Sequence, residues 1–248
     1  KEEEFYTKRM NWPKGNRELQ VTEWDNIVAT NRPLPDLTGW SCTVGIDYTK
    51  LRDWAAVNFH FKKGDQRYDF GRYWVCTQNP DLDRVKAPWR NWPECVAVDD
   101  VEIAPELLTD YIAETAQKHN IKKIALDNYR YALMKDALEK IGFDPKERKN
   151  VYLVRPSDIM KVQPVIDSCF NKQYFVWGDN PALRWATNNT KLVRSGKKEG
   201  TDTGNFYYAK IEAKSRKTDP FMALVASMVV EDELGTGQST YDDLPVIT

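Results

Sequence analysis

Two short apolar runs that each end in an aspartate constrain the fold of this chain most. The run SCTVGID ends at Asp47, and the run IKKIALD ends at Asp127. An ionised carboxylate beside an apolar segment is costly unless it is paired or binds a cation. If the two runs are neighbouring strands of one sheet, Asp47 and Asp127 lie side by side. The sequence therefore predicts an acidic site at the ends of two core strands.

The segments around these runs predict an α/β fold. Alternating segments over 54–63 and 68–77, joined by the turn signal Gly64-Asp65, form an antiparallel meander with the first run. Helical spacing on both sides of the second run implies strand–helix–strand units, which add parallel strands to the meander. The further predicted elements are helices over 105–119, 131–141, 157–171 and 220–230, a strand over 151–154 and a β-hairpin over 190–212. This order is that of the ribonuclease H-like fold: a mixed sheet flanked by helices, with an added hairpin.

Composition excludes several classes of protein. The 248 residues include 36 Lys and Arg against 37 Asp and Glu, so a uniformly basic nucleic-acid coat is excluded, whereas a local basic patch is not. No apolar run approaches the roughly 20 residues that a membrane helix needs. Four cysteines without a CxxC pair and only two histidines disfavour a structural zinc site.

Two further aspartates extend the acidic site. Asp219 directly precedes the apolar helix over 220–230, and Asp53 follows Asp47 after a short turn. Ligands that are all carboxylate oxygens favour a hard cation, Mg²⁺ or Mn²⁺, and such a cluster can hold two ions about 4 Å apart. One ion would activate a water molecule and the other would stabilise the leaving oxygen of a phosphodiester. Each aspartate also has a plain structural interpretation, as a turn former or a helix cap.

A basic segment lies close to Asp219 in the sequence. Residues 190–217 contain eight Lys or Arg and three Asp or Glu, a local net charge of +5. Such a hairpin could hold a polyanion over the acidic site through phosphate contacts, or it could be a solvated surface element. The candidate DNA-binding residues are Lys191, Arg194, Lys197, Lys198, Lys214 and Lys217.

Three segments, in order, resemble nuclease motifs of the large terminase subunit of tailed double-stranded DNA bacteriophages. TVGIDYTKLRDWAAV resembles the first motif, IKKIALDNYRYALMKDAL the second and KIEAKSRKTDPFMALVASM the third. The lead-in FYTKRMNWP resembles the segment that joins the motor to the nuclease. The resemblance runs from Phe5 to Met228, nearly the whole chain.

The resemblance implies a Mg²⁺- or Mn²⁺-dependent endonuclease, with two ions, that cleaves concatemeric viral DNA during genome packaging. Asp47, Asp127 and Asp219 would be the catalytic, metal-binding residues, and Asp53 an accessory metal ligand. The implied partners are double-stranded DNA, an ATPase motor domain in the full-length chain, a small terminase subunit and a portal, in the cytoplasm of the infected bacterial host and with no membrane. Because no GxxxxGK[ST] loop is present and the chain lacks an initial Met, we expect an excised nuclease domain without ATPase activity.

The expected organisation is a lead-in over 1–40 that packs on the nuclease, a nuclease domain over 41–231 and an acidic, mobile tail over 232–248. Three alternatives remain open. Another ribonuclease H-like nuclease, of resolvase or transposase type, would keep the acidic residues and change the DNA substrate. A sugar kinase or actin-like ATPase would need Gly-rich phosphate loops, which we do not find. A non-catalytic module that binds DNA or a portal would carry a degenerate site.

Overall fold

A seven-stranded mixed sheet organises residues 20–195 and 205–237, which the computed structural model describes. Strands β1 (Ser41–Asp47), β2 (Trp54–Lys63) and β3 (Gln66–Cys76) form an antiparallel meander. Strands β5 (Asn120–Asp127) and β6 (Val151–Val154) continue it in parallel beyond β1. The spatial order is β4-β3-β2-β1-β5-β6, so the predicted ribonuclease H-like mixed sheet is confirmed.

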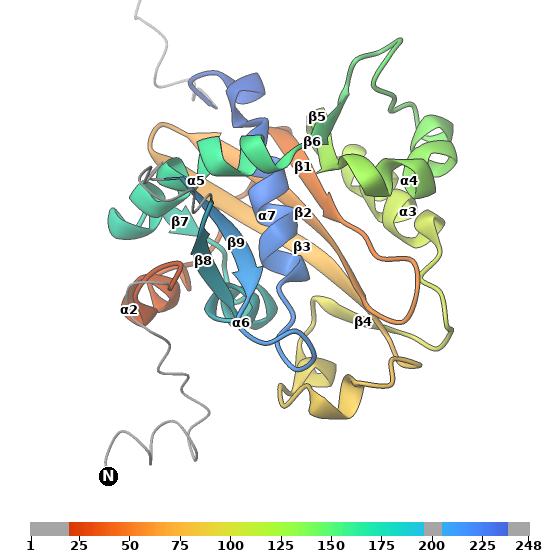
Figure 1. The fold of residues 1–248 in the computed structure, drawn as a ribbon. Helices are drawn as coiled ribbons and strands as arrows, with labels where there is room; N and C mark the ends of the chain where they lie inside the picture. Colours follow the sequence, from red (N-terminus) through yellow and green to blue (C-terminus); the bar gives the residue numbers. More distant parts are fainter. Residues whose placement is uncertain (1–19, 196–204, 238–248) are drawn as a thin grey trace, which may run out of the picture.

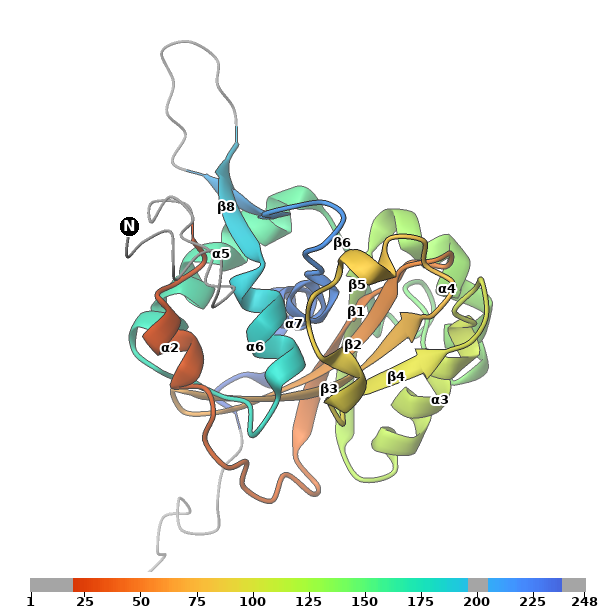
Figure 2. The same cartoon turned by 90° about the horizontal axis from the view of Figure 1, so that it is seen from below.

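Helices cover both faces of the sheet (Figure 1, Figure 2). One face packs against two helices, α3 (Pro105–Ala116) and α4 (Asn128–Lys140). The apolar core on the opposite face includes side chains from α5 (Pro156–Asn171), α6 (Pro181–Asn188) and α7 (Asp219–Val229). The predicted hairpin, formed by β8 (Thr190–Arg194) and β9 (Phe206–Lys210), lies on this second side.

Several short elements were not predicted. Strands β4 (Cys95–Val98) and β7 (Phe175–Val176) pair in parallel with β3. Helix α2 (Trp24–Val28) lies in the lead-in, where we expected no regular structure. Helix α6 begins after Asn180, whose side chain accepts a hydrogen bond from the Leu183 N–H at 2.9 Å. The segment 79–94 contains the short 3₁₀ helices η2 (Leu82–Arg84) and η3 (Trp89–Asn91).

Close packing of β1 on α7 sets the geometry of the strand ends. A Cβ atom on Gly45 would lie 1.8 Å from the carbonyl oxygen of Ala223, so only glycine fits there. The hydroxyl of Thr43 donates a hydrogen bond to the Ser227 carbonyl at 2.9 Å. Because side chains alternate along a strand, Asp47 projects from the same face of β1 as Thr43. The predicted carboxylate is therefore on the side of the sheet that α7 covers.

A buried ionic network, which we call the His60 network, fixes the far end of α7. His60 lies between two carboxylates: its Nδ1 is 2.8 Å from Asp69 and its Nε2 is 2.9 Å from Glu231. Glu231 opens the 3₁₀ helix η4 (Glu231–Leu234) directly after α7 and also accepts two hydrogen bonds from Arg67, at 2.7 and 2.8 Å. Asp69 also accepts a hydrogen bond from the indole of Trp177 at 3.2 Å. The network joins strands β2 and β3 to the C-terminal end of α7.

Some predicted features lie outside the described residues. These are the first part of the lead-in, the hairpin tip over 196–204 with Lys197 and Lys198, and most of the tail over 232–248. The division of the chain into lead-in, nuclease domain and tail remains a prediction. Within residues 20–195 and 205–237, no helix has the length and apolar character needed to cross a membrane.

Candidate active site

Asp47 and Asp127 lie at the same edge of the sheet, as the sequence predicted. Strands β1 and β5 run parallel with Ile46 opposite Leu126, and each aspartate is the next residue along its strand. Both side chains line one pocket of about 540 Å³. The predicted juxtaposition of the two strand ends is therefore present in the structure.

Asp219 and Asp53 approach this edge from other elements. Asp219 is the first residue of α7 and is only 3% exposed, while Asp53 directly precedes β2. Burial, followed by repulsion from Asp219, raises the pKa of Asp47 to about 8. Burial likewise raises the pKa of Asp219, and the charge of Asp53 adds to the effect. The charges of Asp53 and Asp219 are thus close enough to Asp47 to disfavour its ionisation.

Lys210, on β9, lies among these carboxylates. Its Nζ is 3.8 Å from Asp219 Oδ2. Burial lowers the pKa of Lys210, but the charges of Asp219, Asp53 and Asp47 outweigh that effect and raise it. Sequence reasoning did not place Lys210 at the site. Its only signal was membership of the basic segment, and its position depends on how the hairpin docks.

The hydrogen bonds of the aspartates show which structural roles these residues also have. Asp127 is exposed and caps α4, because its carboxylate accepts the Tyr129 N–H at 2.8 Å. Asp53 accepts a hydrogen bond from Lys217 Nζ at 2.5 Å. The N-cap residue of α7 is Thr218 rather than Asp219. Helix capping is therefore a real function of Asp127, whereas Asp219 is free of it.

The donor chemistry of the site fits a hard cation. As placed, no three His, Cys, Asp or Glu side chains among residues 20–195 and 205–237 form a ready metal cluster. Asp219 Oδ2 is nevertheless buried with no hydrogen bond and with Lys210 as an ion-pair partner at 3.8 Å, and a cation stabilises a carboxylate oxygen in such a position. The charges of Asp219, Asp53 and Asp47 all act on the Lys210 ammonium, so these carboxylates already lie close to one positive charge.

The candidate DNA-binding residues fall into two groups. Lys191 and Arg194 lie on β8, and Lys214 lies between the hairpin and α7 with its Nζ 4.0 Å from Asp81. Lys217 is only 4% exposed and forms its ion pair with Asp53. The buried position of Lys217 makes it a neighbour of the acidic residues rather than a surface cation.

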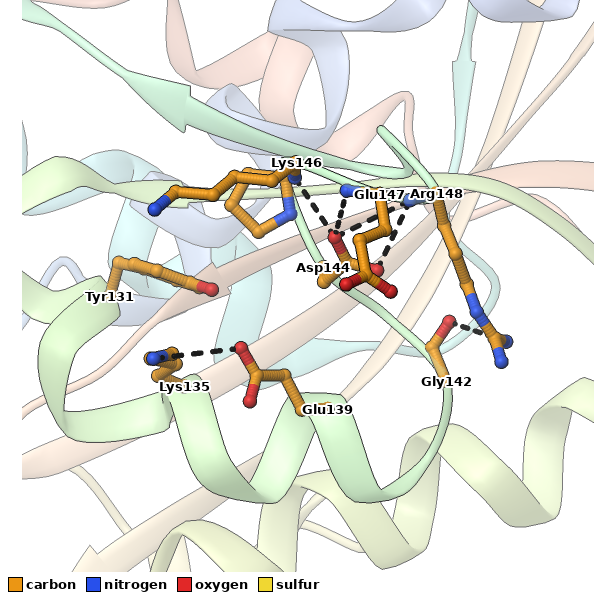
Figure 3. A pocket seen from close by; sticks show the side chains of 9 residues that line it. Tyr131, Lys135, Glu139, Gly142, Asp144, Lys146, Glu147 and Arg148 are labelled. Carbon is orange, nitrogen blue, oxygen red and sulfur yellow. Dashed lines mark hydrogen bonds and ion pairs between the residues drawn. The ribbon is translucent and has the colours of Figure 1, made fainter.

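A second cavity lies away from the aspartates, beside α4 and the loop that follows it (Figure 3). Its volume is about 490 Å³. Asp144 accepts backbone N–H groups of Lys146, Glu147 and Arg148, and Lys135 lies 3.8 Å from Glu139. These charges compensate one another within the cavity wall, so we assign this cavity a structural role.

The strand order defines a ribonuclease H-like fold. Among solved structures, the HK97 bacteriophage large terminase aligns with a TM-score of 0.70 and 15% identity, over 85% of this chain and 43% of that chain. The large terminase nuclease from thermophilic phage G20c aligns with a TM-score of 0.51 and 10% identity, over 84% of this chain and 97% of that chain. No protein-family model and no curated protein matches the sequence. The resemblance to large terminase nucleases is thus confirmed at the level of the fold, and the chain spans less than half of the HK97 protein.

Proposed function

We propose that this chain is a Mg²⁺- or Mn²⁺-dependent endonuclease that cuts concatemeric viral double-stranded DNA during genome packaging. The observation that carries the proposal is that Asp47, Asp53 and Asp219 all lie near the half-buried ammonium of Lys210, with Asp127 at the adjacent strand end. The shared fold with large terminase nucleases supports it.

Asp47, Asp127 and Asp219 would hold two divalent ions, with Asp53 as an accessory ligand. When bound, such ions supply Lewis-acid stabilisation of the scissile phosphate and of the attacking water. The protein's own contribution is rigid placement. Asp47 is fixed by its strand and Asp219 by a helix that packs directly on that strand, which keeps the carboxylates oriented before DNA arrives.

The basic residues have two roles in this proposal: two of them position or balance the carboxylates, and the others bind DNA. Lys217 holds Asp53 in place through its ion pair, and Lys210 offsets the carboxylate repulsion from the hairpin side. Lys191, Arg194, Lys197, Lys198 and Lys214 contact backbone phosphates. Such contacts position DNA without selecting a sequence, so the domain cuts with little base preference.

The packaging context is part of the same proposal. The alignment covers 43% of the HK97 large terminase, which leaves room for an ATPase motor in a longer chain. A small terminase subunit and a portal complete the assembly, and the work takes place in the cytoplasm of the infected bacterial host.

Plasmid cleavage tests the proposal. The purified chain is incubated with supercoiled plasmid and Mn²⁺, Mg²⁺ or EDTA. Two variants are assayed in parallel: Asp127→Ala, and the matched control Asp136→Ala, which removes an exposed aspartate on α4, the helix that Asp127 caps. We expect linear and then smeared DNA only with metal, in the wild type and the control but not in Asp127→Ala. Cleavage of a four-way junction in preference to linear duplex would instead indicate a resolvase. A folded protein that cuts nothing would refute the nuclease.

A further inference from the structure

The pocket shared by Asp47 and Asp127 has an apolar floor that metal chemistry does not require. Three elements meet there: the end of β6, the first turns of α5 and the middle of α7. The floor consists of Ile46, Val154, Ile159, Met222, Val225 and Ala226. At about 540 Å³ the pocket has the size of an ordinary small-molecule site, which is mostly apolar with a few polar groups at its edge.

The rim of this pocket carries an unusually exposed aromatic side chain. Tyr129 is 84% exposed, the most exposed of the large apolar or aromatic side chains in residues 20–195 and 205–237. It lies two residues after Asp127, in the first turn of α4, and its backbone N–H is held by the Asp127 carboxylate. The cap therefore fixes the position of Tyr129 relative to the acidic edge, although its ring is in solvent.

A cation completes the rim. Arg130 is exposed and lines the same pocket as Asp47. The pocket thus combines an apolar floor, an aromatic face and a guanidinium beside the carboxylates. A nucleotide has matching parts, because its base and sugar are largely apolar on their faces and its phosphate is an anion.

We propose that this pocket is a nucleoside subsite that takes one base and its deoxyribose next to the scissile phosphate, with Tyr129 stacking on the base and Arg130 contacting a flanking phosphate. The inference rests on the proposed nuclease function and deepens it. Stacking on an aromatic ring tolerates any base, because every base has a π-face. In duplex DNA the base must leave its stack, so the strand is distorted locally where it is cut.

The test separates contacts to bases from contacts to the backbone. Fluorescence anisotropy measures binding of a short labelled oligothymidylate and of an abasic oligomer of the same length and charge, with Ca²⁺ in place of Mg²⁺. Single strands are used because they bind without the cost of unpairing. We expect the wild type to bind the oligothymidylate about tenfold more tightly than the abasic oligomer. Tyr129→Ala should reduce that ratio to near one, and Tyr129→Phe should keep it.

Leu133→Ala is the matched control, because Leu133 is exposed on the same helix and does not line the pocket. It should leave the ratio unchanged. If the wild type cuts plasmid yet binds both oligomers equally, or if Tyr129→Ala keeps the wild-type ratio, the subsite is refuted and the nuclease stands. If the wild type neither cuts plasmid nor binds either oligomer, the nuclease and the subsite both fall.

Discussion

Replacing Glu231 with glutamine should destabilise the protein far more than a surface substitution. The side chain is about 10% exposed and faces His60, Arg67 and Lys62. Glutamine keeps the shape but removes the charge, and it leaves Arg67 and His60 buried with a weaker partner. Removing one member of a buried ion pair costs about 3–5 kcal/mol. For a domain of this size that corresponds to a fall in Tm of roughly 6–20 °C.

The stability that Glu231 confers should depend on pH, because one of its partners is the titratable side chain of His60. Burial lowers the pKa of His60, but the charge of Asp69 and the hydrogen bonds and charge of Glu231 outweigh it and raise the pKa to about 9. A group whose pKa is raised from 6.5 to about 9 on folding contributes about 3 kcal/mol. That contribution is complete below pH 6.5 and is lost as the pH rises through 9. Once His60 is neutral, Glu231 retains only its arginine and lysine partners.

Chemical denaturation followed by tryptophan fluorescence, in EDTA, measures the effect. The difference in unfolding free energy between wild type and Glu231→Gln should be about 3 kcal/mol or more at pH 7, and should shrink by at least about 1 kcal/mol at pH 10. Using the difference cancels the shared contribution of the site carboxylates. Glu233→Gln is the control, because its partner Lys123 makes a surface ion pair worth under about 1 kcal/mol. A loss below 1 kcal/mol at pH 7, or a difference that does not change with pH, would refute the reasoning.

Three further predictions concern other parts of the structure. Gly45→Ala should lower the free energy of unfolding by more than about 3 kcal/mol, because the new Cβ would meet the Ala223 carbonyl. Gly39→Ala, whose Cβ would have nothing within 4 Å, should lower it by only about 1 kcal/mol because of the positive φ at this position. Both losses are measured by denaturation. Asp47→Asn should stabilise the metal-free protein by at least about 1 kcal/mol at pH 8, because it removes a carboxylate whose pKa is raised by burial and by Asp219. The same substitution should abolish plasmid cleavage. A lower Tm of the variant in EDTA would contradict the prediction. When DNA affinity is measured against salt concentration, Lys191→Ala should lower the slope of log K against log salt by about one. Lys217→Ala should leave that slope unchanged, because Lys217 is buried against Asp53. Equal slopes for the two variants would refute this assignment of Lys191 to DNA contact and Lys217 to the acidic site.

The sequence predicted the core of the fold and two residues of the site because their signals are local. The runs that end at Asp47 and Asp127 are strongly apolar and long enough to identify as strands, and each carboxylate follows directly from its strand's end. Asp219 could be placed because the apolar segment after it begins abruptly at Pro220, and the helix itself begins at Asp219. Elements of two to five residues, such as β7 and α2, have too few positions to show a period.

Contacts between distant segments could not be predicted. His60 and Glu231 are 171 residues apart, and nothing near either residue indicates the other. Lys210 joins the carboxylates only because the hairpin docks beside α7. Tyr129 precedes the helix predicted over 131–141, and its exposure next to an apolar pocket became evident only when β6, α5 and α7 were placed around it.

Helix α7 has a mechanical consequence that follows from how it is held. Its 11 residues span about 16 Å between Asp219 at one end and the His60 network at the other, with the Gly45 contact in between. An α-helix resists compression along its axis, so α7 acts as a strut between the acidic edge and the base of the C-terminal segment. Because the His60 network also ties this end of α7 to β2 and β3, a displacement after Leu234 would be shared between the sheet and Asp219.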